Sequence, residues 1–239
     1  MEEFEGLILK RIDYKESSKI IYLYTAKGLK SVLVHGANKL NSPYLGMTET
    51  LSLVKVFCQG KNLKVLKDAS LILQYSLIKN DLNKYTYVMH LFELIYHFSE
   101  NEFDHEKLYM FLLKILILIE TTPDYIPYIY MFESKLLYLL GVNPLFKQCV
   151  VCGKKENLFF SIKEGGMCCQ EHFHEPLRFK EEVLLLFQTL YYFDLQTSEL
   201  PFIEEPLLKE LRHLLDLYYD YHLNFQTKSR TVLKGLIGY

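Results

Sequence analysis

Two pairs of residues in this sequence have the chemistry and spacing of metal ligands. Cys149 and Cys152 have two residues between them, and Cys169 and His172 repeat that spacing further along the chain. The 16 residues between the pairs match structural zinc sites, in which two tight turns bring four ligands to one tetrahedral ion. Gly153 suits the turn after the first pair, where a side chain would crowd the inward-pointing amides. We therefore predict that these four residues bind Zn²⁺.

The choice of ligands in the second pair is open. Cys168 directly precedes Cys169 and can take its place, and His174 can take the place of His172. An alternative is that these are ordinary buried cysteines. It is disfavoured because four of the five Cys fall within 21 residues. A thioredoxin-like redox role for the first pair is disfavoured too, because the βαβ context of that motif is missing.

The predicted metal site is structural rather than catalytic. A catalytic zinc keeps one coordination position open and works beside a general base. The nearby carboxylates are Glu171 and Glu175, and neither lies in a His-x-Glu or His-Glu-x-x-His pattern. We therefore expect a closed site that stabilises a small lobe.

The composition provides ample material for a core and no segment suited to a membrane. Half of the 239 residues are hydrophobic, and no run reaches 18 apolar residues. The acidic residues 1–5 lack the basic and apolar regions of a signal peptide. We therefore expect a cytoplasmic protein, in which clustered cysteines bind metal instead of forming disulfides.

Charge is distributed unevenly along the chain, although the formal net charge is only −2. Residues 1–80 carry 12 Lys and Arg against 7 Asp and Glu, whereas residues 81–239 carry 15 against 22. The front of the chain is therefore positive and the rear is negative. This pattern predicts that the first part contacts a polyanion.

The front of the chain is predicted to form strands. β-branched and aromatic residues are concentrated in five short stretches, at residues 6–14, 19–25, 29–34, 50–58 and 63–67. A tight turn containing Gly28 and a second turn at residues 59–62 separate two pairs of these stretches. Because an open sheet of five short strands would leave unpaired edges, we predict a small β-barrel of the oligonucleotide/oligosaccharide-binding (OB) type.

From residue 81 the hydrophobic period becomes that of helices. Asp81 and Asp104 are the expected N-caps of the first two long helices. Pro127 is tolerated in the first turn of a third helix, and Gly141 is a suitable residue to end it. Further helices are expected near residues 180–193 and 204–222. The apolar face of the first long helix is expected to comprise Tyr85, Val88, Met89, Phe92, Ile95 and Tyr96.

The predicted fold class is therefore α+β. We expect an OB barrel at residues 1–79 and an all-helical domain at residues 80–239. A zinc lobe at about residues 145–176 is expected to be inserted between helices of the second domain.

Six basic residues of the predicted barrel are candidates for contacts with DNA, namely Lys10, Arg11, Lys15, Lys27, Lys30 and Lys39. Together with the nearby Tyr14, Tyr22, Tyr24 and Tyr44, they combine a cationic track with stacking surfaces, as single-stranded nucleic-acid binding requires. Adjacent residues in a strand point to opposite faces, so Lys10 and Arg11 are not expected to share a groove. The alternative is a solvated barrel surface with tyrosines in the core.

No catalytic residues are predicted. The histidines outside the zinc lobe form no nucleophile–base motif and are expected to be surface or hydrogen-bonded core residues. The chain has no G-x-x-x-x-G-K-[ST] or G-x-G-x-x-G phosphate loop, so no nucleotide cofactor is expected. Cys58 is expected in the barrel core. We therefore predict a protein that is not an enzyme.

Three motifs, in this order, resemble one known family. The first is residues 6–25 with Gly28 and residues 36–42. The second joins residues 140–144 with Cys149-x-x-Cys152-Gly153 and residues 165–166, and the third is residues 211–223 followed by residues 228–233. The chain resembles the RecO family of bacterial recombination mediators, which act in the RecFOR pathway of DNA repair. One departure is that the last metal ligand of that family is usually Cys, where this chain has His172.

The resemblance implies an OB barrel, a helical domain and a zinc lobe. It implies binding to single- and double-stranded DNA, annealing of complementary strands, and help in loading RecA onto strands coated by single-stranded DNA-binding protein. The implied partners are RecR and the acidic, apolar C-terminal tail of single-stranded DNA-binding protein, and the implied location is the cytoplasm at the bacterial nucleoid. By the family pattern, Lys39 and Arg11 are the foremost DNA contacts.

Two other functional classes remain as alternatives. A zinc-containing OB-fold module that binds RNA or acts in transcription would use the same barrel and would recognise a specific duplex or folded RNA. A zinc-dependent enzyme acting on nucleic acid would need a solvent-open metal.

Overall fold

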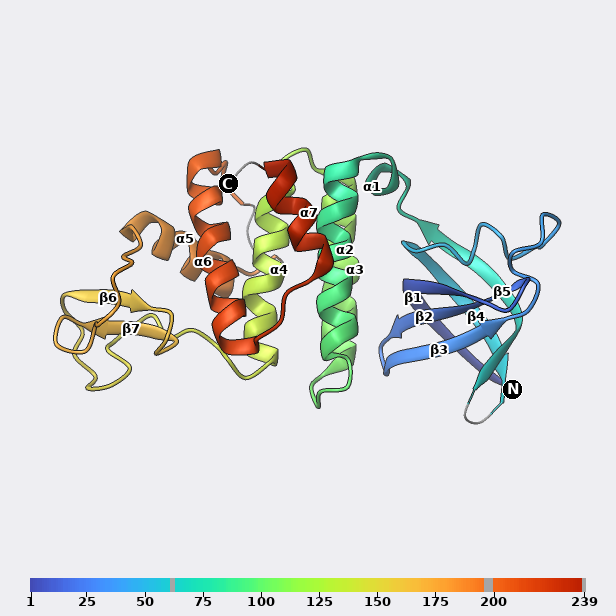
Figure 1. Cartoon of the computed structure of the whole chain (residues 1–239), viewed down its shortest axis with the longest axis horizontal. Coiled ribbons are helices and arrows are strands. Elements are labelled where there is room, and N and C mark those ends of the chain that lie inside the picture. The colour runs from blue at the N-terminus through green and yellow to red at the C-terminus, as the bar shows by residue number, and fades with distance from the viewer. Residues whose placement is uncertain (61–62, 196–199, 238–239) are drawn as a thin grey trace.

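Strands β1 to β5 close into a barrel at one end of the molecule (Figure 1). The structure is a computed structural model that describes residues 1–60, 63–195 and 200–237. The strands are β1 (Glu2–Tyr14), β2 (Ser18–Thr25), β3 (Gly28–Val34), β4 (Ser52–Gln59) and β5 (Lys64–Gln74). Their order around the barrel is β1-β2-β3-β5-β4, and β3 pairs with β5 in parallel. The predicted barrel of the OB type is thereby confirmed.

The barrel closes because alternate residues of its strands point inward. Ile8, Ile21, Leu23, Val54 and Val56 are buried together in its interior, and Cys58 joins them as expected. Gly28 adopts a φ of +84° at the β2–β3 turn, a conformation that glycine accepts without strain. Part of the predicted turn at residues 59–62, namely Lys61 and Asn62, lies outside the described residues.

Seven helices follow in the described part of the chain. They are α1 (Ser76–Asn80), α2 (Leu82–Phe98), α3 (His105–Thr121), α4 (Ile126–Leu139), α5 (Glu181–Tyr192), α6 (Glu205–Leu223) and α7 (Lys228–Ile237). The predicted caps are confirmed, because the side chain of Asp81 accepts hydrogen bonds at the start of α2 and that of Asp104 does so at the start of α3. Pro127 lies in the first turn of α4. The short α1 and the C-terminal α7 were not predicted.

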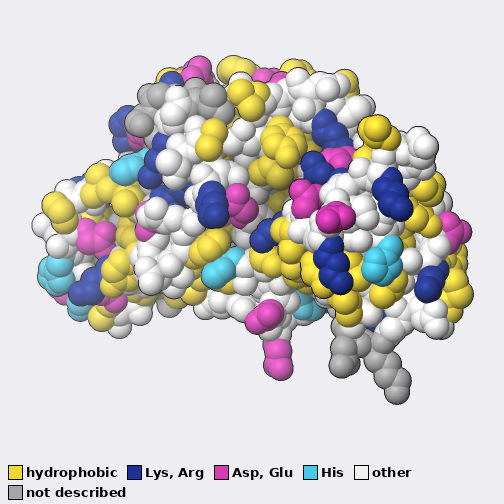
Figure 2. Space-filling model, turned by 45° about the vertical axis from the view of Figure 1, so that its right-hand side comes forward, with side chains coloured by type: hydrophobic (Ala, Val, Ile, Leu, Met, Phe, Trp, Pro, Cys, Tyr) yellow, Lys and Arg dark blue, Asp and Glu magenta, His cyan; other side chains and the backbone are white. Residues whose placement is uncertain are grey.

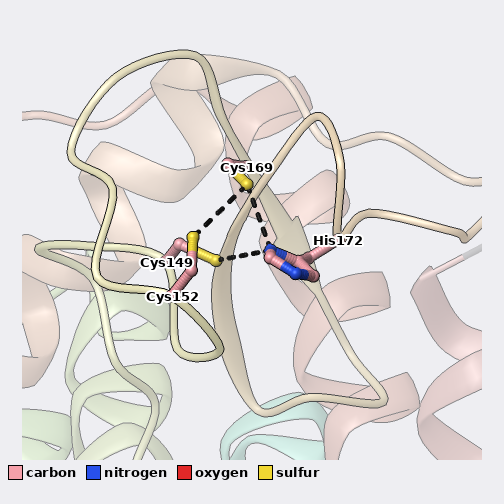
Figure 3. A group of neighbouring side chains, drawn as sticks. All are labelled: Cys149, Cys152, Cys169 and His172. Carbon is pink, nitrogen blue, oxygen red and sulfur yellow. Dashed lines mark hydrogen bonds between the residues drawn. The ribbon is translucent and has the colours of Figure 1, made fainter.

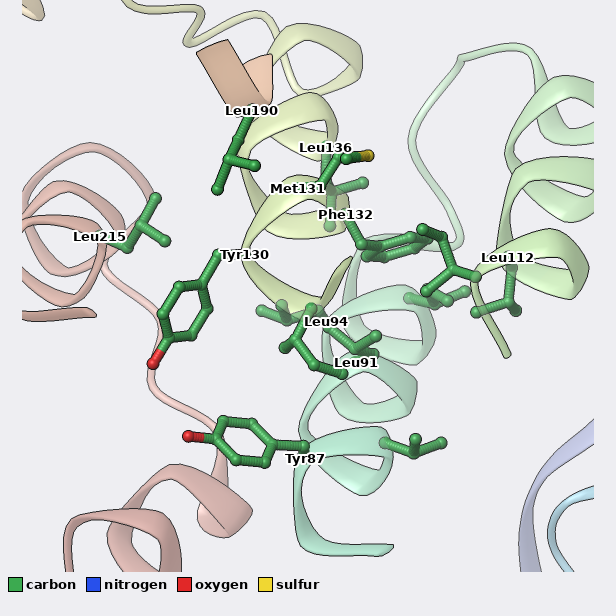
Figure 4. Packing of buried hydrophobic residues seen from close by; sticks show 14 of the residues in the cluster. Tyr87, Leu91, Leu94, Leu112, Tyr130, Met131, Phe132, Leu136, Leu190 and Leu215 are labelled. Carbon is green, nitrogen blue, oxygen red and sulfur yellow. The ribbon is translucent and has the colours of Figure 1, made fainter. Parts of the chain in front are cut away.

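The helices and the barrel share one core. Inside the helical part, Phe132 of α4 lies beside Leu112 of α3, whereas Tyr130 of α4 and Tyr87 of α2 point to the side of Leu215 on α6 (Figure 4). The same cluster of buried side chains includes residues that point outward from the barrel strands and their connections, namely Leu7, Leu9, Tyr24, Leu51 and Leu53. The Tyr24 hydroxyl lies 3.0 Å from Nδ1 of His105 on α3. Barrel and helices are therefore joined by apolar packing rather than by a flexible linker.

A small lobe is inserted between α4 and α5, at the end of the molecule opposite the barrel (Figure 1). Its hairpin consists of β6 (Leu158–Ser161) and β7 (Gly166–Cys169). Helix α6 holds the lobe in place, because the Tyr218 hydroxyl donates to the carbonyl of Val142 at 2.9 Å and His222 Nε2 donates to that of Ile162 at 2.6 Å. In the described part of the chain, no helix has the length and apolar character needed to cross a membrane.

A buried ion network joins the last helices. Glu133 of α4 contacts Arg212 of α6, whose guanidinium also lies 2.7 Å from Asp216. Arg230 of α7 contacts the same Asp216 at 2.8 Å and binds Asp220 with both of its terminal nitrogens. Because buried charges are costly unless paired, this network fixes α7 against the other helices.

Candidate metal centre and nucleic-acid surface

The first half of the metal centre is a tight turn. The amide of Gly153 donates to the carbonyl of Cys149 at 2.9 Å, and the amide of Cys149 donates to the carbonyl of Lys154 at 2.7 Å. Gly153 has a φ of +77°, as expected for the residue that closes such a turn. The amide of Val150 donates to the carbonyl of Met167 at 2.8 Å, which ties this turn to β7. The position of Cys149 and Cys152 is therefore set by backbone hydrogen bonds.

The second half follows directly from β7. Cys169 is the last residue of the strand, and its carbonyl accepts hydrogen bonds from the amides of His172 and Phe173, each at 2.9 Å. This turn brings the His172 ring back over the end of the strand. Aromatic side chains enclose the lobe around it, with Arg178 stacked on Phe159 at 4.4 Å from the ring centroid.

The four predicted ligands converge, as Figure 3 shows, and their ligand atoms all lie within 4.8 Å of one another. The sulfurs of Cys152 and Cys169 are 3.7 Å apart. His172 Nδ1 lies 3.3 Å from the sulfur of Cys169 and 3.7 Å from that of Cys149. A tetrahedron with zinc–sulfur and zinc–nitrogen bonds of ordinary length has edges of about 3.5–3.8 Å. The donor set therefore fits a tetrahedral metal ion such as Zn²⁺.

The electrostatics of the cluster favour bound cations. Desolvation opposes ionisation of Cys149, but the backbone N–H groups of Cys169, Cys152 and Val151 lower the pKa of Cys149 to about 5. Desolvation also opposes ionisation of Cys169, and the side chain of His172 is foremost among the groups that lower its pKa. Hydrogen bonds to Cys169 and Cys149 in turn raise the pKa of His172. The thiolates of Cys149 and Cys169 are thus stabilised. At Cys152 the backbone hydrogen bond from Lys154 is outweighed by desolvation and by the neighbouring Cys149 and Cys169, so that the pKa of Cys152 is raised.

The alternative metal ligands and the candidate general bases named in the sequence analysis lie outside the cluster of four ligands. Cys168 and His174 are not among the four converging residues. Desolvation raises the pKa of Cys168 to about 11, which disfavours its thiolate. Glu171 pairs with Lys154 at 2.8 Å, and Glu175 accepts hydrogen bonds from backbone amides of the β6–β7 turn. Both candidate bases are therefore engaged in holding the lobe together.

The six candidate DNA contacts do not form one row. Lys15 lies in the β1–β2 turn, and the loop that carries Lys39 packs beside that turn, where the Asn38 amide donates to the carbonyl of Ser17 at 3.0 Å. Lys27 lies in the β2–β3 turn, at the other end of these strands, and Lys30 follows in β3. Figure 2 shows basic side chains on this side of the molecule as separate groups with acidic ones between them.

Lys10 and Arg11 both line a groove of about 750 Å³ between the barrel and α2. The expectation that they cannot share a groove is therefore wrong. The register of β1 against β2 shifts between Ile8 and Lys10, but Lys10 and Arg11 themselves pair in regular succession with Tyr22 and Ile21. The two long side chains border one groove because Lys10 reaches the Tyr96 ring of α2, whereas Arg11 reaches Glu49.

Ion pairs engage part of the basic front. The Glu49 carboxylate contacts Arg11 at 2.9 Å and the buried Lys19 at 3.3 Å, so Arg11 already has an anionic partner. Glu3 pairs with Lys55, and Glu2 pairs with Lys64. Among residues 1–60 and 63–80, the lysines that lack such an acidic partner, including those of the turns, therefore provide most of the positive charge available to a ligand.

The stacking surfaces also differ from expectation. Tyr24 is fully buried against α3, so it is a core residue and not a stacking surface. Tyr22 packs edge-on against Tyr96 of α2, with ring centroids 5.3 Å apart. Tyr14 is exposed beside Lys15, whose Nζ lies 5.4 Å from its ring. The sequence did not reveal this division, because each tyrosine faces α2, α3 or solvent according to tertiary packing.

A five-stranded barrel of the OB type, a scaffold used by proteins that bind oligonucleotides or oligosaccharides, is here packed on a helical bundle that carries a lobe with four converging Cys and His residues. The family model for the N-terminal part of recombination protein O matches residues 1–75, and the model for its C-terminal part matches residues 79–231. The chain therefore belongs to the recombination protein O family.

Three relatives that match nearly the whole chain are named DNA repair protein RecO. The chain is 29% identical over 238 residues to the DNA repair protein RecO of Bacillus pumilus, covering 97% of this chain and 93% of the relative. It is 30% identical over 237 residues to that of Bacillus subtilis, covering 96% and 92%. It is 27% identical over 242 residues to that of Listeria innocua, covering 99% and 95%.

Proposed function

We propose that this protein is a recombination mediator in DNA repair. It binds single- and double-stranded DNA, anneals complementary single strands, and helps to load RecA onto strands coated by single-stranded DNA-binding protein. The observation that carries the proposal is the match of family models to both parts of the chain, combined with the closed barrel and its lysine-bearing turns. The relatives' names as DNA repair proteins support the same role.

The mechanism we propose is charge neutralisation on the barrel. Lysines of the turns, with Lys39 and Lys15 foremost, bind the phosphates of two strands and lower their mutual repulsion, while the bases stay free to pair. Lys10, Lys27 and Lys30 extend this surface, and Arg11 joins it by exchanging Glu49 for a phosphate. No covalent bond is formed or broken, so the protein needs no catalytic residue and is proposed not to be an enzyme.

The metal is proposed to be structural Zn²⁺ held by Cys149, Cys152, Cys169 and His172. Four protein ligands fill a tetrahedral site and leave no position for a reacting water. When bound, the ion contributes cross-linking of two turns, which stabilises a lobe whose own core is small. This ligand count disfavours the alternative of a zinc-dependent enzyme.

A groove between α3, α4 and α5 is proposed to bind the acidic, apolar tail of single-stranded DNA-binding protein. The groove has a volume of about 650 Å³. Its apolar surface includes Met110, Tyr138 and Tyr192, which are 61%, 65% and 56% exposed. Lys107 and Lys114 border it. An apolar floor with cationic edges complements a peptide that carries both acidic and apolar side chains.

Two further parts of the proposal rest on the family resemblance. RecR is the proposed protein partner, and the proposed location is the cytoplasm at the nucleoid. Neither a nucleotide cofactor nor a membrane enters the mechanism.

The proposal is tested by strand annealing without ATP on complementary strands coated by the cognate single-stranded DNA-binding protein. We expect the protein to accelerate annealing and the Lys39→Glu variant to do so less. Lys163→Glu, at an exposed position in the β6–β7 turn, is the matched control. Absence of acceleration by the wild-type protein, combined with selective binding to one folded RNA, would replace the proposal with the RNA-binding alternative.

A further inference from the structure

The groove between the barrel and α2 has a lining that belongs only in part to the proposed barrel surface. Its walls come from β1, from α1, from α2 and from the segment that leads into α7. Lys79 of α1 and Lys228 of α7 line it together with Lys10 and Arg11 of β1. The groove is therefore continuous with the barrel strand that carries two of the proposed DNA contacts.

The α2 wall of this groove is aromatic and only partly covered. Tyr85, Met89 and Tyr96 have the spacing of a core-facing stripe, yet they are half-buried and line the groove. Lys10 Nζ lies 4.5 Å from the centroid of the Tyr96 ring. Next to it, His97 stacks on Phe225 with centroids 3.7 Å apart. Such rings interleaved with cations provide stacking surfaces for nucleic-acid bases.

The carboxylates of the groove are neutralised by partners within the protein. Glu49 is held between Arg11 and Lys19. Glu93 accepts from the amide of Lys228 at 2.6 Å and from the hydroxyl of Ser229 at 2.7 Å, at the N-terminus of α7. Since a helix N-terminus carries partial positive charge, it offsets the charge of Glu93. The rim therefore presents the ammonium groups of Lys10, Lys79 and Lys228 to an approaching anion.

We propose that this groove is a second binding surface for single-stranded DNA, which continues the path of a strand from the barrel onto the helical part. In the groove, bases stack on Tyr96, and phosphates contact Lys79 and Lys228. The inference rests on the proposed function, because it extends the nucleic-acid surface of the barrel. A peptide segment of a partner is the competing occupant. Continuity with β1 and the alternation of rings and cations favour the strand.

The experiment compares oligonucleotides of two lengths on the full-length protein, using fluorescence anisotropy at low salt. A short oligonucleotide of about 10 nucleotides occupies the barrel alone, whereas one of about 30 nucleotides reaches the groove. The test variants are Lys79→Glu with Lys228→Glu, and separately Tyr96→Leu. Lys163→Glu is the control for a charge reversal outside the groove, and Lys39→Glu reports on the barrel. Thermal unfolding monitors the fold of each variant.

We expect the double variant to bind the long oligonucleotide about tenfold more weakly and the short one nearly as well as the wild type. The dependence of log affinity on log salt should decrease by about 1 to 1.5, because two phosphate contacts are lost. Tyr96→Leu should weaken binding of the long oligonucleotide with little change in that salt dependence, since stacking is not ionic.

The two proposals fail in different ways. If the wild type binds neither oligonucleotide, the proposed function is wrong. If Lys39→Glu weakens DNA binding while the groove variants bind both oligonucleotides as tightly as Lys163→Glu does, DNA binds to the barrel and the groove inference is wrong. If the groove variants bind DNA normally but lose binding of a partner protein, the groove belongs to a peptide.

Discussion

The carboxylate of Glu133 on α4 lies 2.7 Å from the guanidinium of Arg212 on α6, and both side chains are almost completely buried. Desolvation alone would raise the pKa of Glu133. The charge of Arg212, together with the contact from His90, outweighs it and lowers that pKa to about 2. Asp216 and Arg230 extend the contact to α7. The pair is therefore the centre of the interactions that hold three helices together.

We predict that the free energy of unfolding of the Glu133→Gln variant decreases less than that of the wild type when the pH is lowered. A carboxyl with a lowered pKa in the folded state contributes stability above its unfolded pKa near 4.5, and this contribution is lost as the pH falls toward the folded value of about 2. At neutral pH the variant should lose about 3 kcal/mol, because Arg212 keeps its buried charge with one partner fewer. At about pH 3 the difference from wild type should narrow by about 2 kcal/mol.

Urea unfolding at the two pH values measures both effects. The comparison cancels the titration of carboxyl groups that wild type and variant share. If the difference in the free energy of unfolding between wild type and variant is the same at pH 7 and at about pH 3, Arg212 does not lower the pKa of Glu133 and the prediction is wrong.

Loss of the metal should destabilise the small lobe. We expect Cys149→Ser combined with Cys152→Ser to abolish stoichiometric zinc and to lower Tm by about 5–10 °C, because the ion cross-links two turns that have little core of their own. Metal content by mass spectrometry and thermal unfolding provide the measurements.

Two single substitutions decide between the adjacent cysteines. Cys169→Ser should lose zinc, whereas Cys168→Ser should retain it, whatever its effect on packing. Retention of zinc by Cys169→Ser and its loss by Cys168→Ser would reverse the ligand assignment.

Salt should weaken DNA binding by an amount that depends on the lysines of the barrel turns. We predict that Lys39→Glu lowers affinity for single strands about tenfold at low salt and reduces the dependence of log affinity on log salt by about 0.7, the value for one phosphate contact. Anisotropy titrations across a salt series measure both quantities. A Lys39→Glu variant that binds like Lys163→Glu at every salt concentration would remove Lys39 from the DNA surface.

The groove between α3, α4 and α5 should bind a synthetic peptide of the tail of single-stranded DNA-binding protein. We predict that Lys107→Glu combined with Lys114→Glu weakens this peptide about tenfold, and that Tyr138→Ala does so to a similar extent. Calorimetry or anisotropy with labelled peptide measures the change, and Lys163→Glu again provides the control. Unchanged affinity in both variants would place the peptide elsewhere.

The parts of the fold that the sequence predicted are those encoded by local patterns. Strand-forming stretches separated by turns predicted the OB barrel, and Asp81 and Asp104 marked two helix starts. The spacing of Cys149, Cys152, Cys169 and His172 predicted ligands that the structure brings together. In each case the signal lies within a few residues, because caps, turns and ligand pairs are local structures.

The parts that were missed depend on contacts distant in sequence. Helix α7 is short and polar, and it is held by the pairing of Arg230 with Asp216 and Asp220. Lys10 reaches Tyr96 of α2 and Arg11 reaches Glu49, contacts that lie far apart in sequence, so the groove that these two residues share was not expected. Helical periodicity placed Tyr96 on an apolar face, but periodicity does not say whether that face meets a core or a groove.

The apolar seam between barrel and bundle has a practical consequence for truncated proteins. Severing the chain between the two family regions, at residues 76–78, would strip the cover from Leu7, Leu9 and Tyr24 on one fragment and from their partners on the other. Each fragment would then expose a hydrophobic patch that promotes aggregation. Activities assigned to an isolated half should therefore be checked against aggregation, and co-expressed halves should reassociate through that seam.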